Sequence, residues 1–504
     1  MSKTGKGFWS RLFSRPASVG AAPVGRQRIS RGARNAYDGA TKGKRAGGWR
    51  RSGKDANAEL SPAVQAALRG IARDLVRNNP YAARGIAVIA EYLVGDGITF
   101  QVYRDGKVDD VLNKLAREHF DKTNCDALGR HDLYGLQLQA ARSIVESGAV
   151  LMRRRWRRAS DGLPLPFQLQ ILEPDYLDAG RNGPLGGTVD GGYTLDGIEY
   201  SPIGRREGYW LFNGHPGSAK IVRSGSTFVQ AKDIAHVFRA DRPEQEHGAT
   251  WFAPIILRLK DFGDYEDAQL VRQKISAAFA GFVHGDPDGE PISGKDDAGE
   301  STHESLDYVE PGTISYLSDG QTITFPSPPT VDGYIDYSLV THRAIAAGLG
   351  VPYENLTGDL SKVSYISGRL GRLSFLRSVA TWQWTMFIPQ FCGSVERWFL
   401  DAAALMGHDV RGVSLRWTPP RVPLLDPASE VPAIRDAIRS GQDTISNAAR
   451  ERGQDPDTFL DEWAADAAAL DARGLIFDSD PRKVTAVGNP TFPPTRAERE
   501  GKTE

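Results

Sequence analysis

The sequence predicts a multi-domain protein of the α+β class. Residues 61–147 carry apolar side chains at three- and four-residue spacings, which is typical of helices. Residues 149–238 instead consist of short apolar runs separated by Gly, Pro and Asn, which is typical of strands joined by turns. The chain has 504 residues, which is long enough for about three domains. Helices and strands thus occupy separate stretches, as they do in α+β proteins.

Four helices are expected before the strand-rich region. Ser61-Pro62 offers an N-cap and a first-turn proline for the first helix. Asn79-Pro80 starts the second helix in the same way, and Gly95 ends it. Apolar periodicity predicts two more helices over residues 108–120 and 133–147.

The middle of the chain changes from strands back to helices. Within residues 149–238, the runs 150–152 and 167–172 predict strands. Residues 251–283 and 337–349 are expected to form two helices. Residues 285–330 between them are rich in Gly, Asp and Pro. The strand-like pieces of that region are 313–317 and 322–325.

A polar segment interrupts the helical pattern near residue 350. Pro352 disfavours helix at the residue before it, so the preceding helix should end there. Residues 351–368 cannot form a core because they are mostly polar. We therefore expect a loop whose flexible ends are Gly350 and Gly368.

A long apolar helix and smaller elements follow the polar segment. Residues 369–405 carry bulky apolar side chains at helical spacing, which predicts a long buried helix with a kink at Pro389. Beyond it we expect a strand over 413–417, two helices over 430–438 and 456–470, and a disordered polar tail after Asp478.

Charge is distributed unevenly along the chain. The net charge is only −1, but residues 1–54 contain 14 Lys or Arg against the single acid Asp38, whereas the remainder contains 48 basic and 62 acidic residues. This composition predicts a disordered basic arm, over residues 1–58, that is attracted to nucleic acid or another acidic surface. A solubilising tail without a dedicated partner is the alternative. The arm's candidate contact residues are Arg26, Arg28, Arg31, Arg34, Lys42, Lys44, Arg45, Arg50 and Arg51.

Cysteine content and hydropathy argue against several classes. Only Cys125 and Cys392 are present, and they form no CxxC pair, which favours a reducing cytosolic setting over a disulfide framework or a zinc site. The N-terminus lacks the apolar run of a signal peptide, and no stretch approaches the roughly 20 apolar residues of a membrane span. We expect a protein that is neither secreted nor membrane-inserted.

Several short fragments, in a fixed order, carry a family resemblance. Together with the helix, polar loop and long helix around residue 350, they resemble the lambda-like family of tailed-phage portal proteins over roughly residues 61–453. The family usually shows an Asn-Tyr-Ser-Ser run in its channel loop, whereas this chain reads Ser364-Tyr-Ile-Ser367, a departure that concerns side-chain contacts of the loop. The fragments are Asn78–Arg84, Val94–Ile98, Glu146–Gly148, Leu172–Asp175, Gly197–Tyr200, Ile234–Phe238, Arg242–Gln245, Glu310–Gly312 and Leu425–Pro427.

The resemblance implies a portal fold with named parts. They would be a basic arm (1–58), an α+β wing (59–247, completed by 406–427), stem helices (248–283 and 336–350), a small β-containing clip (284–335), a channel loop (351–368), a long wing helix (369–405), a helical crown (428–475) and a flexible tail (476–504). Subunits of this fold would assemble into a ring. The channel-loop residues expected to face DNA are Glu354, Asn355, Thr357, Asp359, Ser361, Lys362 and Ser364.

The resemblance also implies a function and partners. The ring, a dodecamer in the family, would form the vertex channel for packaging and ejecting double-stranded DNA. It would dock the terminase large subunit and later the head-tail connector, and it would contact the major capsid protein and scaffold. The expected location is the portal vertex of the virion, after assembly in the host bacterial cytoplasm. No cofactor, membrane contact or enzymatic activity is implied.

Catalytic and metal-binding patterns are weak by comparison. Residues 289–295 match most of a phosphate-binding loop, but Asp296 replaces the Ser or Thr that would bind magnesium, so an exposed loop is favoured. His236 is most simply a core or interface histidine in a strand. The acids Asp261, Asp264, Glu266 and Asp267 favour a solvated or intersubunit helix face over a metal site. No catalytic residue or metal ligand is nominated.

Two other functions remain open at this stage. A nucleic-acid-processing enzyme that binds through the basic arm would remain active as a monomer. A capsid structural protein of another type would form shells or closed lattices in place of free rings.

Overall fold

The computed structural model describes four long stretches of the chain, residues 52–185, 191–219, 225–278 and 333–475. It also describes residues 48, 282–284, 294–295, 301–302, 322–324, 477 and 482. The chain divides into two compact units at Asp55/Ala56, and the fold below is that of the second. The candidate residues of the basic arm, the strand expected over 313–317 and most of the C-terminal tail lie outside the described residues.

Five helices form the N-terminal part of this unit, of which α1 was not expected; Ser61 precedes α2 but makes no capping hydrogen bond with its side chain, whereas Asn79 caps α3 as expected. The Asn79 side chain accepts hydrogen bonds from the backbone N–H groups of Tyr81 and Ala82. The Asp109 side chain caps the fourth helix, which therefore begins two residues later than expected. All four expected helices are confirmed. The bounds are α1 Ala56–Glu59, α2 Pro62–Asn78, α3 Pro80–Leu93, α4 Asp110–Phe120 and α5 Leu133–Ser147.

Three antiparallel sheets follow the strand-rich pattern. One has the order β15-β1-β2, the second β10-β3-β4, and the third is a five-stranded meander from β5 to β9. The first sheet joins distant parts of the chain, because β15 comes from the C-terminal half. The bounds are β1 Thr99–Arg104, β2 Lys107–Val108, β3 Ala149–Trp156, β4 Phe167–Leu172, β5 Gly183–Pro184, β6 Tyr193–Leu195, β7 Ile198–Tyr200, β8 Arg206–Phe212, β9 Ser226–Gln230, β10 Ile234–Phe238 and β15 Val413–Thr418.

The helix expected over residues 251–283 is shorter than predicted. It runs as α6 over Ile256–Ala278. The residues before α6 form turns because Pro254 disfavours helix at Ala253. In addition, the backbone N–H of Trp251 donates a hydrogen bond to Val145 O, which fixes the chain to the end of α5. Residues 282–284 form strand β11 (Phe282–His284), which pairs with β14 (Thr322–Thr324).

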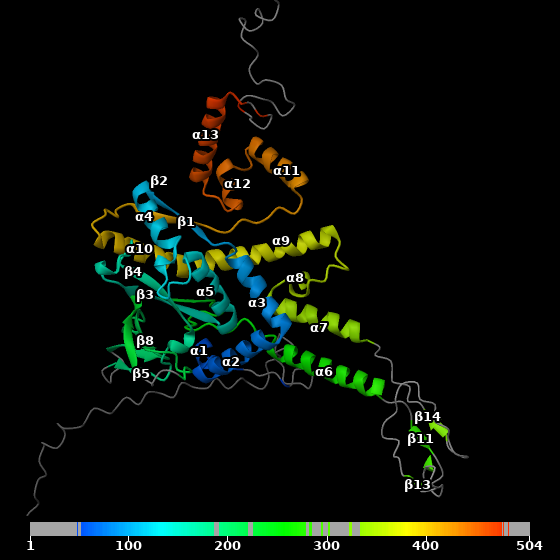
Figure 1. Cartoon of the computed structure of the whole chain (residues 1–504). Helices are drawn as coiled ribbons and strands as arrows, with labels where there is room; N and C mark the ends of the chain where they lie inside the picture. The colour runs from blue at the N-terminus through cyan, green and yellow to red at the C-terminus, as the bar shows by residue number, and fades with distance from the viewer. Residues whose placement is uncertain are drawn as a thin grey trace, which may run out of the picture. The chain divides into compact units, whose positions relative to one another are not determined.

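The second expected helix of the pair is confirmed as α7 (Tyr334–Leu349). It lies beside α6 (Figure 1). Phe262 of α6 packs edge-on against His342 of α7, with ring centroids 4.7 Å apart. The ring centroids of Tyr265 in α6 and Tyr337 in α7 are 4.5 Å apart. These aromatic contacts hold the two helices together along their facing sides.

The long helix expected over 369–405 is confirmed, and it starts four residues earlier. It consists of α9 (Tyr365–Trp382), a π-helical segment η9 (Gln383–Cys392) and α10 (Gly393–Leu405), which follow one another without a break (Figure 1). Pro389 lies within η9. Proline has no N–H and its ring clashes with the carbonyl of an α-helical turn, so the wider turn accommodates it. Gly393 N–H accordingly bonds Ile388 O, five residues back.

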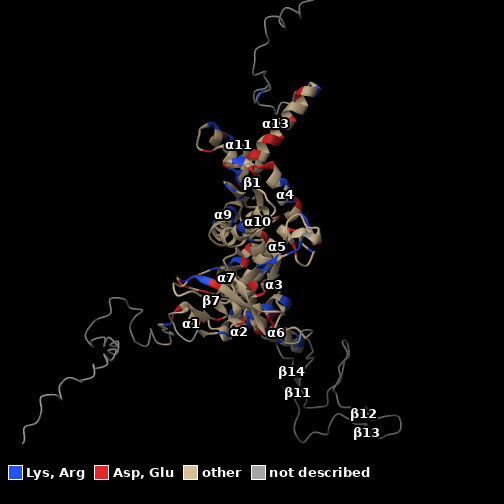
Figure 2. Cartoon of the chain, turned by 90° about the vertical axis from the view of Figure 1, so that its left-hand side faces the viewer, with Lys and Arg blue, Asp and Glu red and all other residues tan. Residues whose placement is uncertain are grey.

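Three helices lie beyond β15, and one of them was not expected. The prediction for 430–438 and 456–470 is confirmed by α11 (Pro427–Arg439) and α13 (Pro456–Arg473), whereas α12 (Ile445–Glu451) is too short to show a clear apolar period. Asp455 and Asp457 accept hydrogen bonds from the buried Tyr103 hydroxyl, which ties α13 to β1. Asp and Glu outnumber Lys and Arg in α13, whose ribbon shows red segments among tan ones (Figure 2).

Two glutamines, the buried Gln137 and the half-buried Gln390, complete backbone hydrogen bonding at strand ends. Gln137 of α5 bonds both the N–H and the C=O of Ile98, at 2.8 and 3.0 Å. Gln390 of η9 does the same for Phe238, the last residue of β10, at 2.9 and 3.2 Å. A primary amide carries both N–H donors and a carbonyl acceptor, so it can pair with both backbone groups of one residue as a neighbouring strand would. The long helix is thereby fixed to the edge of the sheet.

Replacing Gln390 should test this link. Gln390→Leu keeps the volume but leaves the N–H and C=O of Phe238 without partners, so we expect a loss of roughly 2–4 kcal/mol in stability, read as a lower thermal midpoint. Gln442→Leu, at an exposed position after α11, should change stability by less than about 0.5 kcal/mol. Equal midpoints for the two variants would show that Gln390 does not hold the sheet edge.

Candidate functional site

The first half of the expected channel loop is a short helix held against the body. Residues 353–357 form α8 (Tyr353–Thr357), whose Leu356 is only 2% exposed. Arg84 of α3 donates a hydrogen bond to Asn355 O at 3.2 Å. A Cβ atom at Gly85 would lie 2.6 Å from Leu349 and 3.6 Å from Leu356, so glycine lets α3 approach this closely. The expectation of one continuous loop over 351–368 is therefore wrong in its first half. The apolar residue Leu356 within this segment is buried, and the short helix that carries it packs against α3.

The end of the expected loop is also helical. Ser364 is the N-cap of α9: its hydroxyl accepts from Ser367 N at 3.2 Å, and its own N–H donates to Ser367 Oγ at 3.1 Å. This reciprocal capping box starts the helix at Tyr365. Gly368 consequently lies inside α9 and is not a flexible loop end. The serine spacing was visible in the sequence as Ser364-Tyr-Ile-Ser367, but serine stands where a Glu or Gln is usual in the capping box.

The remaining link, residues 358–363, is short and carries three polar or charged residues beside the apolar Leu360 and Val363. It begins at Gly358, whose φ of +74° is left-handed. Asp359 accepts hydrogen bonds from Ser361 N at 3.0 Å and from the Tyr353 hydroxyl at 2.9 Å. Hydrogen bonds donated by Ser361 and by the Tyr353 hydroxyl stabilise the carboxylate and lower the pKa of Asp359. Asp359 is therefore ionised at neutral pH. Ser361 and Lys362 are exposed.

The structure distributes the seven predicted loop residues over three local settings. Glu354, Asn355 and Thr357 are half-buried on α8, and Ser364 is occupied in capping α9. Asp359, Ser361 and Lys362 lie together on the link between the two helices. Leu360, which is 68% exposed, lies on the same link.

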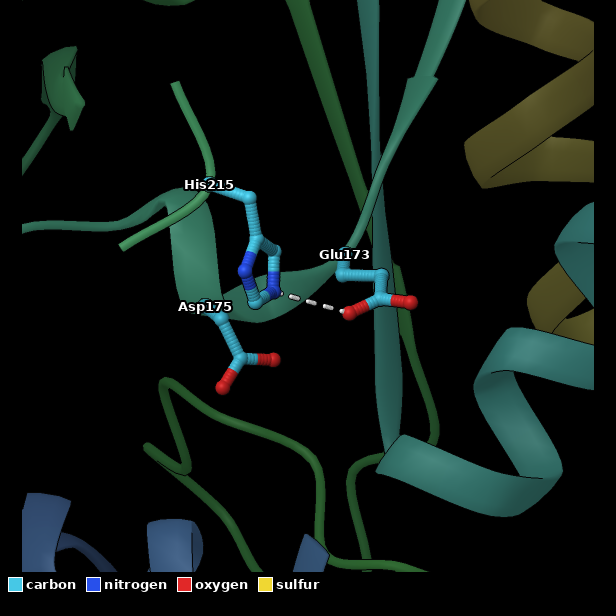
Figure 3. A group of neighbouring side chains, drawn as sticks. All are labelled: Glu173, Asp175 and His215. Carbon is cyan, nitrogen blue, oxygen red and sulfur yellow. Dashed lines mark hydrogen bonds and ion pairs between the residues drawn. The ribbon is translucent and has the colours of Figure 1, made fainter. Parts of the chain in front are cut away.

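A second polar cluster lies at the end of β4. Glu173, Asp175 and His215 place ligand-type atoms within 4.8 Å of one another, and His215 Nε2 lies 3.1 Å from Glu173 Oε2 (Figure 3). Glu173 and Asp175 belong to the fragment Leu172–Asp175, which entered the sequence analysis only as part of a pattern. No sequence signal pointed to His215, which comes from a loop far along the chain.

An arginine already neutralises this cluster. Arg73 of α2 donates to Glu173 at 2.8 Å and to Asp175 at 2.6 Å. Burial raises the pKa of Asp175, but the hydrogen bond from Arg73 and the charges of Arg69 and Arg73 outweigh it and lower the pKa overall. The guanidinium group thus takes the place that a metal ion would need, and the cluster works as an ionic joint between α2 and the end of β4.

Beside this joint lies a small polar cavity of about 30 Å³, with room for one or two water molecules. It is lined by His236 and His247, and within the described residues His236 Nδ1 and His247 Nε2 have no hydrogen-bond partner. Burial lowers the pKa of both rings, His247 to about 4, so both are neutral at pH 7. The expectation that His236 is a core histidine in a strand is confirmed, since it lies in β10 and is 9% exposed.

The other candidate patterns do not build a site among the described residues. Asp261, Asp264 and Asp267 are exposed on α6, and Glu266 accepts a hydrogen bond from Tyr334 at 3.1 Å. Of the segment resembling a phosphate-binding loop, only Gly294–Lys295 is described, and it forms the short strand β12 paired with β13 (Ser301–Thr302). No helix in the described ranges is long and apolar enough to cross a membrane.

Comparison with known proteins first defines the class. The chain is 24% identical over 433 residues to a protein named "Probable portal protein" from Halomonas phage phiHAP-1, with 81% of each chain covered. It is 24% identical to the portal protein of Escherichia phage N15, covering 64% of this chain and 66% of the relative. It is 23% identical to portal protein B of Escherichia phage lambda, covering 61% and 65%. The class is that of phage portal proteins.

The family follows from a model that matches most of the chain. Residues 42–383 match the family described as phage portal protein, lambda family. The chain belongs to this family. The match includes α6, α7, α8 and the start of the long helix, and the expected resemblance is thereby confirmed.

Solved structures resemble this chain only weakly. A chain from "Neck of native GTA particle computed with C12 symmetry" is 15% identical, with a TM-score of 0.46, covering 79% of this chain and 95% of that one. A HK97 family phage portal protein from Corynebacterium diphtheriae is 10% identical, with a TM-score of 0.29, covering 74% and 97%. With TM-scores below 0.5, the family assignment rests on the sequence matches.

Acid should destabilise the fold through a histidine that stays neutral when folded. His119 of α4 is fully buried against Phe120 and Phe167, neither ring nitrogen has a partner among the described residues, and burial lowers its pKa to about 3. Between pH 6.5 and about 3 the unfolded chain binds a proton that the folded chain does not, so stability falls as pH falls, by up to about 1.4 kcal/mol per pH unit.

His119→Leu should remove this contribution. We expect stability at pH 7 to be unchanged or slightly higher, because no buried polar group is left unpaired, and the decline toward pH 4 to become shallower. Leu112→Met, in the same helix, carries no titrating group and should shift stability equally at every pH. Thermal midpoints measured from pH 7 to pH 4 decide the matter, and identical slopes for His119→Leu and wild type would contradict this account.

Proposed function

We propose that this protein is the portal subunit of a tailed phage. Subunits would assemble into a ring, as the family's dodecamers do, around a channel for packaging and ejecting double-stranded DNA. Membership of the lambda portal family supports the proposal. The observation that carries the channel role is the link 358–363, held at one end by the docked helix α8 and at the other by the capped helix α9.

The link has the chemistry that sliding requires. Tight DNA binding comes mainly from Lys and Arg neutralising phosphates. Asp359 and Lys362 carry opposite charges, and Ser361 adds a short neutral hydroxyl, so each subunit offers weak contacts of mixed sign. A ring multiplies these contacts without creating a strong binding site. DNA could then pass while backflow meets resistance from every subunit.

The remaining roles follow from the proposal. The ring would dock the terminase large subunit during packaging and the head-tail connector afterwards, and it would contact the major capsid protein and scaffold during assembly. The subunit itself would be non-enzymatic, with no cofactor or metal, because ATP hydrolysis belongs to the motor. It would reside at the portal vertex of the virion, after assembly in the host bacterial cytoplasm.

The proposal assigns the parts of the fold to the parts of a portal. α6 and α7 would be the stem and residues 284–335 the clip. The sheets with α2–α5 and the long helix would be the wing, and α11–α13 the crown. Residues 1–58 would include the basic arm, although residues 56–58 already belong to α1.

Replacing the link should separate ring formation from DNA handling. When residues 359–363 become a Gly-Ser linker of equal length, Gly358 and Ser364 still end α8 and begin α9, so rings should form and dock the motor. Packaging should stall late or packaged DNA should leak, because the contacts that resist backflow are gone. Nuclease-protected DNA per particle is the measurement.

A matched replacement shows whether the effect is specific. Residues 440–443 join α11 to α12 at the surface, and the same Gly-Ser change there should leave the protected DNA at wild-type level. Full packaging rate and full genome retention in the link variant would show that the link does not grip DNA. Loss of rings would show that it is structural.

The basic arm should matter for incorporation or retention and not for the ring. Residues 1–54 carry a balance of +13, so their contacts with DNA, scaffold or capsid should weaken as salt rises. Deleting them should spare ring formation, because the compact second unit begins at Ala56. Incorporation into proheads or DNA retention should fall. Unchanged yield of infectious particles would mean that the arm is only a tail.

A further inference from the structure

We propose that one face of β3 and β4 docks an extended acidic segment of another protein. Arg153 and Arg155 occupy alternate positions of β3, so both point to the same face of the sheet. Arg157, just beyond the strand, joins them there, because its Nε donates a 2.7 Å hydrogen bond to the side chain of Gln168. Gln168 of β4 stands directly opposite Arg155. We call Arg153, Arg155 and Arg157 the arginine row.

Two members of the row lack partners although they are half-buried. Arg153 and Arg155 make no hydrogen bond or ion pair with any residue of the described ranges. Burial lowers the pKa of Arg153, the charge of Arg155 lowers it further, and Asp233 offsets only part of the effect. Removing a guanidinium group from water costs free energy unless an anion compensates. The row is therefore typical of a surface that an anionic partner covers.

Three nearby carboxylates are already engaged and do not neutralise the row. Asp233 pairs at 2.7 Å with Arg154, which points to the opposite face of the sheet. Asp161, in the turn after β3, accepts a hydrogen bond from the backbone N–H of Arg158 at 3.0 Å. Asp126, beside Gln168, accepts hydrogen bonds from three backbone N–H groups. Each of these acids thus has partners of its own.

Other cations add to the row instead of neutralising it. Arg158 follows directly in the sequence and is exposed, as is Lys232 of η8 (Ala231–Asp233), which contacts β3. After residue 54 the chain contains 48 basic and 62 acidic residues, so an uncompensated group of cations is an exception on this body. Such a group attracts an anionic partner.

The row is separate from the link proposed to contact DNA. Arg154 of the same strand reaches Asp401 of α10 at 2.7 Å, whereas the link 358–363 leads into the start of α9. The continuous helix from Tyr365 to Asp401 spans roughly 50 Å at 1.5 Å per residue. Figure 1 shows β3 and β4 close to α10, with the start of α9 at the other end of the long helix. The two surfaces can therefore be tested independently.

The spacing of the row favours an extended peptide. Alternate residues of a strand are roughly 6.6 Å apart, and the same spacing repeats in any extended segment that lies alongside. A segment with Asp or Glu at every second position would place one carboxylate against each guanidinium group, which can bind it through two parallel hydrogen bonds. The phosphates of duplex DNA follow a helical path instead, so they match a straight row less well.

Two labelled peptides of equal composition test the proposal. One alternates Thr with three Glu residues, and the other carries the same three Glu residues side by side. Fluorescence anisotropy with the full chain should show at least about tenfold tighter binding of the alternating peptide, because only its carboxylates reach all three arginines. Arg153→Gln with Arg155→Gln should weaken this binding at least about tenfold, since two charge-assisted contacts are lost.

Matched variants guard against indirect effects. Arg435→Gln with Arg439→Gln, an equal charge change on α11, should bind the alternating peptide like wild type. The thermal midpoint of the variant at Arg153 and Arg155 should not fall, because neither arginine has a partner to lose. Arg153→Glu with Arg155→Glu should lose the Glu peptide and bind a peptide in which Thr alternates with Lys.

The other outcomes would overturn the proposal in distinct ways. Equal binding of the two Glu peptides, or unchanged binding after the Arg→Gln changes, would show that the row docks no acidic strand. Tighter binding of a short DNA duplex, lost in the same variant, would make the row a nucleic-acid surface. Loss of the native oligomer in that variant, measured by native mass spectrometry, would make it a contact between copies. None of these results would bear on the proposed channel link.

Discussion

The fixing of the long helix α9–η9–α10 to the sheet is the constraint on which the rest of the second unit depends. Gln390 satisfies both backbone groups of Phe238 at the end of β10. Arg154 of β3, whose side chain is 2% exposed, reaches Asp233 and Asp401 at 2.7 Å each, and Trp398 donates to Lys232 O. A buried arginine is stable only when its charge is paired, so these contacts allow one position of the helix on the sheet.

That position determines where the link 358–363 lies. The helix begins at Tyr365, because Ser364 and Ser367 cap it there, and α8 is held by Leu356 against α3. Only residues 358–363 separate the two anchored ends. Because both ends of this short link are held by helices, its backbone can move only a little relative to the body. Its side chains can still change rotamer.

Charged groups are treated differently inside the fold and on α6 and α7. Arg73 and Arg154 each meet two carboxylates, which neutralises clusters that would otherwise cost several kcal/mol to bury. Asp261, Asp264 and Arg343 stay exposed and unpaired with any described residue. The body therefore pairs its buried charges internally, whereas the helix pair α6 and α7 keeps several of its charges at the surface.

The sequence by itself determined the class, the order of elements and the family, because apolar period, caps and turn residues act locally. Helices at Pro62, Pro80 and Leu133 begin at the expected residues for that reason. Tertiary structure decided that residues 353–357 are helical, since Leu356 is buried in the core against α3, a helix far along the chain. It also brought His215 to Glu173 and Gln390 to Phe238. Such contacts join residues far apart in the chain, and no local pattern encodes which partner each side chain will meet.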